Sequence, residues 1–322
     1  MFNHKTVLVT GAAGFIGANL VYKLASLNNQ IHIFVKKSSN LWRLKNIIKK
    51  IKIHYIEFNN TKQIERVVQK INPEIIYHLA AHGAYSFQTN QLEIIKTNIF
   101  GTAKLLTALN SVNYQCFVNT GSSSEYGFKN KPMKETDLLE PNSFYAATKA
   151  AATYLCGVFG KNLNKPIVTL RPFSVYGPYE EPARFIPTVI TNIIQGKPIK
   201  LTAKDIRRDF IYIDDVIDCY LKIPLVINKK IYGEVFNIGT GQQYSNDEVA
   251  NLIIKIMRKK AIIKKGGYQE RSWDTNFWVA ETSKANEYLK WKAKYQLEDG
   301  LTKTVNWFKN YENFESIYCQ RS

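Results

Sequence analysis

A tyrosine and a lysine four residues apart, Tyr145 and Lys149, are the side chains whose types and spacing best suit chemistry. Residues i and i+4 lie on one face of an α-helix, so the phenol and the ammonium would stand side by side. A nearby ammonium lowers a phenol pKa of about 10 and would let Tyr145 exchange a proton nearer neutral pH. An isolated pair at this spacing is usually surface decoration, so the interpretation depends on the rest of the chain.

A glycine-rich turn near the start of the chain is typical of dinucleotide binding. The β-branched run 5–10 leads into Gly11, Gly14 and Gly17, and an amphipathic helix follows to about Leu27. Gly11 would permit the tight turn, Gly14 the approach of a pyrophosphate, and Gly17 close packing of helix on strand. N–H groups at the helix N-terminus would then face the phosphates, so we expect the cofactor here.

The end of the second predicted strand favours NADP over NAD. NAD-binding proteins commonly place a carboxylate there, about 20 residues on, to hold the ribose hydroxyls. This chain has Lys36 and Lys37, then Ser38 and Ser39, and no acid. Two cations and two hydroxyls could receive a 2′-phosphate. The alternative is that both lysines are solvated loop charges.

Strand and helix patterns alternate through the first half of the chain, with strands expected at 5–10, 31–35, 51–56, 75–79, 115–120 and 167–170. This alternation indicates an α/β fold, a Rossmann-type doubly wound parallel sheet with helices on both faces. We assign residues 1–172 to an NAD(P)-binding domain, to which segments near 208–240 could return. Residues 173–322 would mainly form a smaller mixed α/β substrate lid, with helices near 185–195, 214–225, 245–257 and 297–311.

The bulk composition describes an ordinary globular protein. The formal charge is +18, but the lysines are dispersed, which favours a polyanionic small molecule over nucleic acid or a membrane. The four cysteines form no CxxC pair and have no histidine at metal spacing, so we expect free thiols, no metal and a reducing compartment. With no signal peptide and no 18-residue apolar run, the sequence predicts a cytoplasmic protein.

Short motifs follow one another along the whole chain. They are TGAAGFIG (10–17), LAAH (79–82), NIFGT (98–102), GSSSEYG (121–127), YAATK (145–149), LRPFSVYGP (170–178), RDFIYIDD (208–215) and FNIGT (236–240). In this order they resemble the extended short-chain dehydrogenase/reductases, which are nucleotide-sugar epimerases, dehydratases and reductases. The resemblance is specific for the superfamily and much less so for the substrate.

The resemblance implies catalytic roles for three residues. Tyr145 would be the general acid/base, Lys149 would bind the nicotinamide ribose, and Ser122 would hydrogen-bond the reacting oxygen. A ketone that accepts hydride becomes an alkoxide, which needs such a proton donor and second hydrogen bond. The positions implied at the cofactor are Gly11, Gly14, Phe15, Ile16, Gly17, Lys36, Lys37, Asn59, Leu79, Ala80, Ala81, Asn98, Tyr145, Lys149 and Arg171.

The substrate implied by the resemblance is a nucleotide-diphosphate sugar. Arg208 and Arg271 match positions that clamp the diphosphate, although salt bridges to Asp209 or Asp274 are the alternative. Ser174 stands where many members have an asparagine, which suggests a narrower substrate set. The remaining candidates on the substrate side are His82, Ser123, Ser124 and Arg184.

The residues after Ser122 bear on the reaction. Similar 4,6-dehydratases carry an Asp-Glu pair where this chain has Ser123 and Ser124, and a hydroxyl cannot replace a carboxylate as a base. Glu125 follows one place too late. Epimerases of the family usually have the second-strand carboxylate that is missing here. We therefore favour NADPH-dependent reduction of a 4-keto-6-deoxy sugar nucleotide over the alternative, an NAD-dependent nucleotide-sugar 4-epimerase.

Two further expectations concern assembly and activity. The resemblance implies a homodimer formed through helices near 98–111 and 146–161, with Leu105, Leu106, Leu155 and Phe159 as apolar candidates. A catalytically silent binding or scaffold protein is a rival of another class. Such relatives usually lose the tyrosine or the lysine, and this chain retains both.

Overall fold

The computed structural model describes residues 3–58, 60–269, 274–311 and 314–319. A seven-stranded parallel sheet lies at its centre, in the order β11-β6-β5-β4-β1-β2-β3. The expected strands are confirmed to within two residues: β1 (Thr6–Thr10), β2 (Gln30–Val35), β3 (Ile51–Tyr55), β4 (Ile75–His78), β5 (Cys116–Thr120) and β6 (Ile167–Pro172). The predicted Rossmann-type α/β fold is therefore correct.

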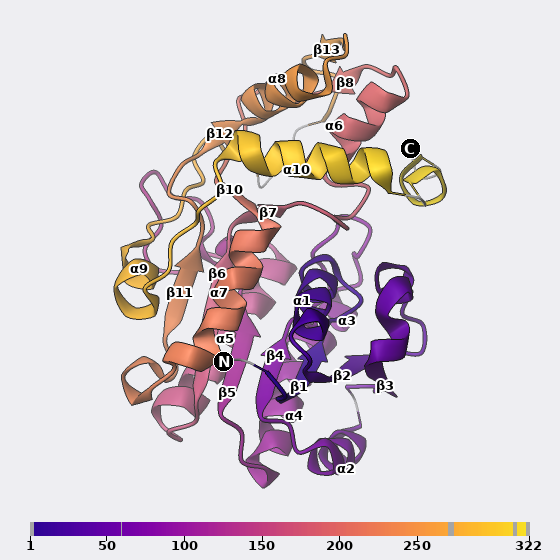
Figure 1. Cartoon of the computed structure of the whole chain (residues 1–322). Helices are drawn as coiled ribbons and strands as arrows, with labels where there is room; N and C mark the ends of the chain where they lie inside the picture. The colour runs from indigo at the N-terminus through magenta and orange to yellow at the C-terminus, as the bar shows by residue number, and fades with distance from the viewer. Residues whose placement is uncertain (1–2, 59, 270–273, 312–313, 320–322) are drawn as a thin grey trace.

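Helices cover both faces of this sheet, as Figure 1 shows. Successive strand residues point to opposite faces, so Val7 and Val9 join one apolar cluster while Leu8 joins the other. The first cluster contains residues of α1 (Phe15–Ser26), α7 (Ile213–Val226) and the 3₁₀ segment Trp42–Lys50. The second contains residues of α2 (Thr61–Ile71), α4 (Gly101–Ala108) and α5 (Phe144–Lys161).

The seventh strand comes from the second half of the chain. β11 (Val235–Ile238) pairs with β6, with Val235 opposite Thr169 and Ile238 opposite Pro172. Of the residues near 208–240, those of β11 belong to the central sheet, whereas β10 (Phe210–Tyr212) pairs with β7 (Ser174–Tyr176) outside it. The exact domain boundaries stay a prediction.

The rest of the second half forms a smaller lid. α6 (Phe185–Ile194), α8 (Asn246–Met257) and α10 (Leu297–Asn310) group together away from the sheet (Figure 1). Three short strand pairs lie outside the central sheet: β7 (Ser174–Tyr176) with β10 (Phe210–Tyr212), β9 (Arg207–Arg208) with β12 (Tyr244–Ser245), and β8 (Ile199–Lys200) with β13 (Ile263–Lys264). α9 (Ser283–Leu289) lies beside β11.

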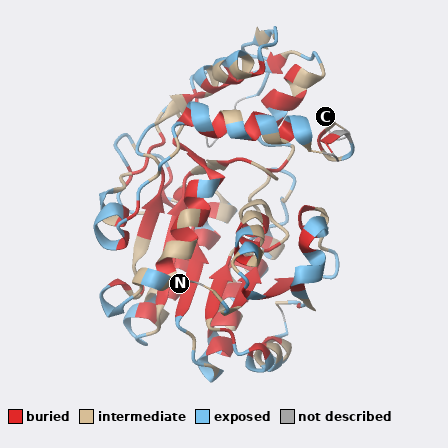
Figure 2. Cartoon of the chain, viewed as in Figure 1, coloured by how far each residue is buried: buried red, intermediate tan, exposed pale blue. Residues whose placement is uncertain are grey.

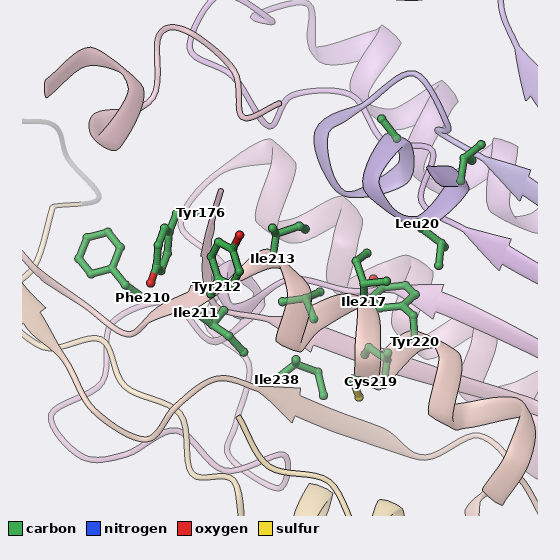
Figure 3. Packing of buried hydrophobic residues seen from close by; sticks show 14 of the residues in the cluster. Leu20, Tyr176, Phe210, Ile211, Tyr212, Ile213, Ile217, Cys219, Tyr220 and Ile238 are labelled. Atoms are coloured by element: carbon green, nitrogen blue, oxygen red, sulfur yellow. The ribbon is translucent and has the colours of Figure 1, made fainter. Parts of the chain in front are cut away.

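One apolar core runs from the sheet into the lid. Figure 3 shows Phe210 and Tyr176 on one side of this packing, Ile213 and Ile217 in its middle, and Tyr220 toward the other side. The Tyr220 hydroxyl is 2.7 Å from Thr120 Oγ1, at the end of β5. Buried residues are concentrated in the strands and on the inner faces of the helices (Figure 2). The lid is thus held in place by the same core that stabilises the sheet.

The structure revises the residues expected at a dimer interface. Leu105 and Leu106 are 0% and 1% exposed, so neither can meet a partner chain. Leu155 and Phe159 pack partly against the same core. The exposed apolar side chains of these helices are instead Phe100, Tyr154 and Val158. Among the described residues, no helix combines the length and the apolar character needed to cross a bilayer.

Candidate active site

A cleft of about 1650 Å³ lies between the carboxyl ends of the strands and the lid. The glycine turn, the end of β4, the loop after β5 and the start of α5 form one side of it, and lid residues such as Arg208 form the other. Pockets for one small ligand are typically about 300–1,000 Å³. The cleft is therefore large enough for two ligands side by side.

The glycine turn leaves room for phosphates at the N-terminus of α1. Gly11 has φ +70°, and a Cβ there would lie 2.5 Å from the carbonyl carbon of Leu79. A Cβ at Gly17 would lie 2.2 Å from the Gly11 carbonyl oxygen, so helix and turn touch backbone to backbone. Gly14 is the N-cap and offers no capping side chain, and the first turn has no acid. The turn residues expected at the cofactor line the cleft: Gly11, Gly14, Phe15, Ile16, Gly17, Leu79, Ala80 and Ala81.

The two lysines after β2 take different positions. Lys36 lines the cleft together with Ser38 and Ser39, and the Lys36 N–H donates to Ser39 Oγ at 3.1 Å. Lys37 is exposed and does not line the cleft, which corrects its assignment to the cofactor. Lys36 Nζ lies 4.0 Å from Glu93 Oε2, and both side chains are partly exposed. Of the two lysines, Lys36 is therefore the one placed for the proposed phosphate contact.

Other residues expected at the cofactor lie elsewhere. Asn98 is 1% exposed, and its side chain holds the loop after β4 by accepting from the His82 N–H at 2.8 Å and donating to the His82 carbonyl at 2.9 Å. Neither Asn98 nor Arg171 lines the cleft, so both positions correct the prediction of direct contact. Asn59 lies outside the described residues, as does Arg271 on the substrate side.

A buried ion pair stabilises the turn that follows β5. Ser122 is the N-cap of a short 3₁₀ turn, Ser123–Tyr126; its Oγ accepts from the Ser124 N–H at 3.1 Å, and its own N–H donates to Glu125 Oε1 at 2.7 Å. Glu125 is fully buried and accepts from Arg171 Nε at 2.8 Å. Arg171 also donates to the Tyr126 hydroxyl at 2.9 Å. The Glu125 and Arg171 charges thus pair with each other in the interior, and the Glu125 carboxylate points away from the cleft.

Tyr145 and Lys149 come from the first turns of α5, whose N-cap Ser143 accepts from the Ala146 N–H at 3.1 Å. The Tyr145 phenol hydrogen-bonds Ser122, although burial raises its pKa above the usual value. Lys149 directs its ammonium to the Thr120 carbonyl oxygen, and burial lowers the Lys149 pKa. The expected lowering of the tyrosine pKa by Lys149 is not seen here: desolvation is the largest effect, and the groups that act against it are Ser122 and Arg184. At neutral pH, Tyr145 carries its proton.

The serine that follows Ser122 is linked to the lid. Ser123 Oγ accepts from Trp278 Nε1 at 3.1 Å, and both residues are more than nine-tenths buried. The Arg208 guanidinium lies over the Trp278 ring at 5.3 Å from its centroid and 3.7 Å from Asp274 Oδ1. Burial lowers the Arg208 pKa to about 10. The salt bridge to Asp274 is thus present, whereas Asp209 accepts N–H groups of Thr240, Gly241 and Ala280 instead.

The remaining substrate candidates line the cleft, namely His82, Ser124, Ser174 and Arg184. Arg184 is the N-cap of α6 and lies over the Tyr85 ring at 5.6 Å. The Arg184 charge acts to lower the pKa of Tyr145, so the two side chains face the same region. Burial and the charge of Lys36 lower the His82 pKa.

Several cleft residues escaped the sequence analysis. Arg43 joins the glycine turn to the lid, Glu180 lines the cleft with its carboxyl buried, and Trp278 holds Ser123. None of them lies in a motif with a recognisable spacing. The sequence offered a signal for Arg43 alone: it follows the second strand, where an arginine can accommodate a 2′-phosphate.

Comparison with known proteins places this cleft in a family. The chain matches the NAD dependent epimerase/dehydratase family over residues 7–239. It is 33% identical to the uncharacterized UDP-glucose epimerase YtcB of Bacillus subtilis, over 93% of this chain and 96% of that protein.

Two crystal structures with similar folds contain NAD. One is the UDP-glucuronic acid 4-epimerase of Bacillus cereus in complex with UDP-glucuronic acid and NAD (30% identity, TM-score 0.83, 94% of this chain and 98% of that one). The other is the dTDP-glucose 4,6-dehydratase of Bacillus anthracis in complex with NAD (29% identity, TM-score 0.83, 96% and 97%). Neither is a reductase by description. The chain belongs to the NAD dependent epimerase/dehydratase family.

Proposed function

We propose that this protein is a nicotinamide-dependent enzyme that epimerises a nucleotide-activated sugar at C4. The observation that carries the proposal is the Tyr145 phenol, hydrogen-bonded to Ser122 in a cleft that also contains the glycine turn and Arg208. The 4-epimerases among the relatives support this reaction over the keto-sugar reduction favoured by the sequence alone.

The residues present fit a dinucleotide. The backbone-to-backbone contact at Gly17 and the side-chain-free N-cap at Gly14 leave N–H groups at the start of α1 for a pyrophosphate. Lys149 would contact the nicotinamide ribose, and Lys36 the adenosine end. A bound nicotinamide would supply reversible hydride transfer at the sugar carbon.

Side chains of this protein would transfer the proton and orient the sugar. Tyr145, once it has lost its own proton, would accept the proton of the C4 hydroxyl as the ketone forms and return it when the new hydroxyl forms. Ser122 would hold the same oxygen through both steps. Arg208 would hold the diphosphate, so that the sugar can turn its other face without leaving the cleft.

Dehydration is disfavoured by the same geometry. Similar dehydratases carry their acid pair directly after Ser122, but here Ser123 is bonded to Trp278 and the neighbouring Glu125 is paired with Arg171. The remaining hydroxyl, Ser124, cannot act as the base.

Incubation of the purified protein with UDP-, dTDP-, GDP- and CDP-hexoses tests the proposal. We expect one of them to reach the same mixture of C4 epimers from either side, measured by NMR, without net change in nicotinamide absorbance. The Tyr145→Phe variant is the matched control and should leave the sugar unchanged. Absence of interconversion with every substrate would reject the epimerase.

The NADPH-dependent reductase remains a second candidate because of one observation. Lys36, Ser38 and Ser39 line the cleft where an NAD-binding protein usually has an acid. Stoichiometric loss of NADPH with a 4-keto-6-deoxy sugar nucleotide would establish this reaction.

If neither reaction occurs but dinucleotide binds, a binding or scaffold role follows. We also propose a cytoplasmic homodimer that uses neither nucleic acid nor membrane.

A further inference from the structure

Glu180 is a buried carboxyl in the wall of the cleft that the proposed reaction does not use. The residue is 7% exposed and lines the cleft just before α6. Among the described residues, its Oε2 atom is buried without a hydrogen-bond partner. A buried polar atom of this kind normally costs free energy, so it calls for a partner that arrives with a ligand.

The chain around Glu180 is fastened to the glycine turn. Asn19 Nδ2, on α1, donates to the Pro178 carbonyl at 2.9 Å. Arg43 Nε donates to the Tyr179 carbonyl at 2.8 Å, and its Nη1 donates to the Ala13 carbonyl at 3.3 Å. The two residues before Glu180 are therefore joined to α1 and to the turn whose N–H groups would face the phosphates of a dinucleotide.

The charges around Glu180 also suit an anion. Arg43 and Arg184 both act on its carboxyl, and Glu181 is the opposing acid, paired with Arg43 Nη2 at 3.0 Å. The other titratable groups near the Glu180 carboxyl are Tyr85 and Tyr318. The Tyr318 hydroxyl donates to the Glu180 backbone carbonyl oxygen at 2.7 Å. The guanidinium groups of Arg43 and Arg184 and the carboxylate of Glu181 together carry a net positive charge as long as the Glu180 carboxyl is neutral.

We propose that Glu180 carries its proton and donates a hydrogen bond to a phosphate oxygen of the bound diphosphate ligand. Burial raises the Glu180 pKa to about 8, which keeps the carboxyl protonated at neutral pH. An ionised carboxylate there would repel the phosphate, whereas the acid form supplies a donor. A hydrogen bond from the Gly177 backbone also acts on the Glu180 carboxyl, and Oε2 is the oxygen that has no partner within the described part of the chain.

Ligand binding must then depend on pH. If only the protonated form accepts the phosphate, Kd rises by up to about tenfold per pH unit above the Glu180 pKa. The proposal rests on the diphosphate ligands of the proposed function but not on the reaction, because binding can be measured whether or not the sugar is converted. NADH and UDP-glucose distinguish a cofactor phosphate from a substrate phosphate.

The experiment is calorimetric titration of the wild-type protein with NADH and, separately, UDP-glucose between about pH 6.5 and about pH 9. We expect one ligand to lose affinity as the pH rises. The Glu180→Gln variant keeps a neutral donor of the same shape, so it should bind that ligand with wild-type affinity at low pH and show little pH dependence. Glu180→Leu removes the donor and should bind more weakly at about pH 6.5, again without pH dependence. Circular dichroism would confirm that both variants fold.

Three outcomes would overturn the proposal. Wild-type affinity for both ligands could be independent of pH, Glu180→Gln could keep the wild-type pH profile, or Glu180→Leu could bind both ligands as tightly as wild type. A protein that shows the pH-dependent binding but converts no sugar would retain this proposal and lose only the epimerase.

Discussion

Arg171 Nε donates to Glu125 Oε2 at 2.8 Å, and the two side chains are 3% and 0% exposed. This buried ion pair supports the turn that carries Ser122, through the Ser122 N–H bonded to Glu125 Oε1. It also explains why an acid next to the serines is no catalytic base. Because Glu125 is paired with Arg171, we expect it to contribute to stability and not to catalysis.

Glu125→Gln should therefore destabilise the protein by about 3–5 kcal/mol, because it leaves the Arg171 charge buried without its counter-ion. The measurement is the free energy of unfolding in urea. Glu140→Gln is the control, since Glu140 pairs with Lys129 and its side chain is 57% exposed. Surface pairs are worth at most about 1 kcal/mol. Equal losses in the two variants would contradict a buried structural role for Glu125.

Tyr145→Phe should lower kcat by about 10²–10⁴-fold, the usual contribution of a general acid/base, while dinucleotide affinity changes little. Because the Tyr145 pKa is raised by burial, the phenol starts as a proton carrier throughout the neutral range. Tyr154→Phe on the same helix is the control, since Tyr154 is 63% exposed. An unchanged kcat for Tyr145→Phe, with Tyr154→Phe also unchanged, would remove Tyr145 from the mechanism.

Lys36→Asp should shift cofactor preference from NADPH toward NADH. A hydrogen bond to a charged group contributes about 1.5–3 kcal/mol, so NADPH affinity should fall by about 10–150-fold. Fluorescence titration with both dinucleotides measures the change. Lys37→Asp makes the same charge change at an exposed side chain outside the cleft and should leave the preference as it is. A similar shift in both variants would indicate a general effect of charge, not a phosphate site.

Acid should unfold the protein partly through His78. This histidine is buried between Thr10 and Thr102, 2.7 and 2.9 Å from their hydroxyls, and burial lowers its pKa from 6.5 to about 3. A depressed pKa means that the stabilisation is fully present above about pH 6.5 and is lost as the pH falls toward about 3, by roughly 5 kcal/mol in total.

His78→Gln should therefore flatten the fall in unfolding free energy between about pH 6.5 and about pH 4, measured by urea titration at each pH. His32, whose pKa is lowered to about 4, should keep part of the slope. His4→Gln changes an exposed histidine and should leave the slope unchanged. A slope for His78→Gln as steep as in the wild type would contradict this account.

Charges at Tyr154 and Val158 should separate the proposed dimer. These residues are 63% and 50% exposed on α5, and Phe100 nearby is 55% exposed. We expect the double variant Tyr154→Glu, Val158→Glu to be monomeric by light scattering at a concentration where the wild type is a dimer. Leu225→Glu on α7, 63% exposed, should leave the dimer intact. A monomeric wild type would reject the proposed interface.

The sheet could be predicted because its strands are short runs of apolar, β-branched residues separated by helical periodicity. The glycine turn could be predicted because motif spacing reflects local backbone geometry. The shared role of Ser122 and Tyr145 came from the resemblance to a known family and stays a prediction. Lys37 and Arg171 were misplaced for a different reason. Sequence spacing does not say which way a side chain turns at a strand end, and Arg171 turned inward to meet Glu125.

Tertiary contacts between distant segments could not be predicted in this way. The hydrogen bond from Trp278 to Ser123 and the links from Arg43 to Ala13 and Tyr179 join residues far apart in the chain. The pKa of Tyr145 was misjudged on similar grounds, because the amount of burial depends on the complete fold.

The position of β11 has a consequence for biosynthesis. β6 ends at Pro172, but its outer neighbour in the sheet is not synthesised until residues 235–238. During translation, or in a fragment that stops near residue 172, β6 is an open edge with unpaired N–H and C=O groups, which can pair with another chain. We expect such a fragment to aggregate, so the cofactor half should not be expressed alone. A cut between the halves becomes practical only if β11 remains with the strands that precede it.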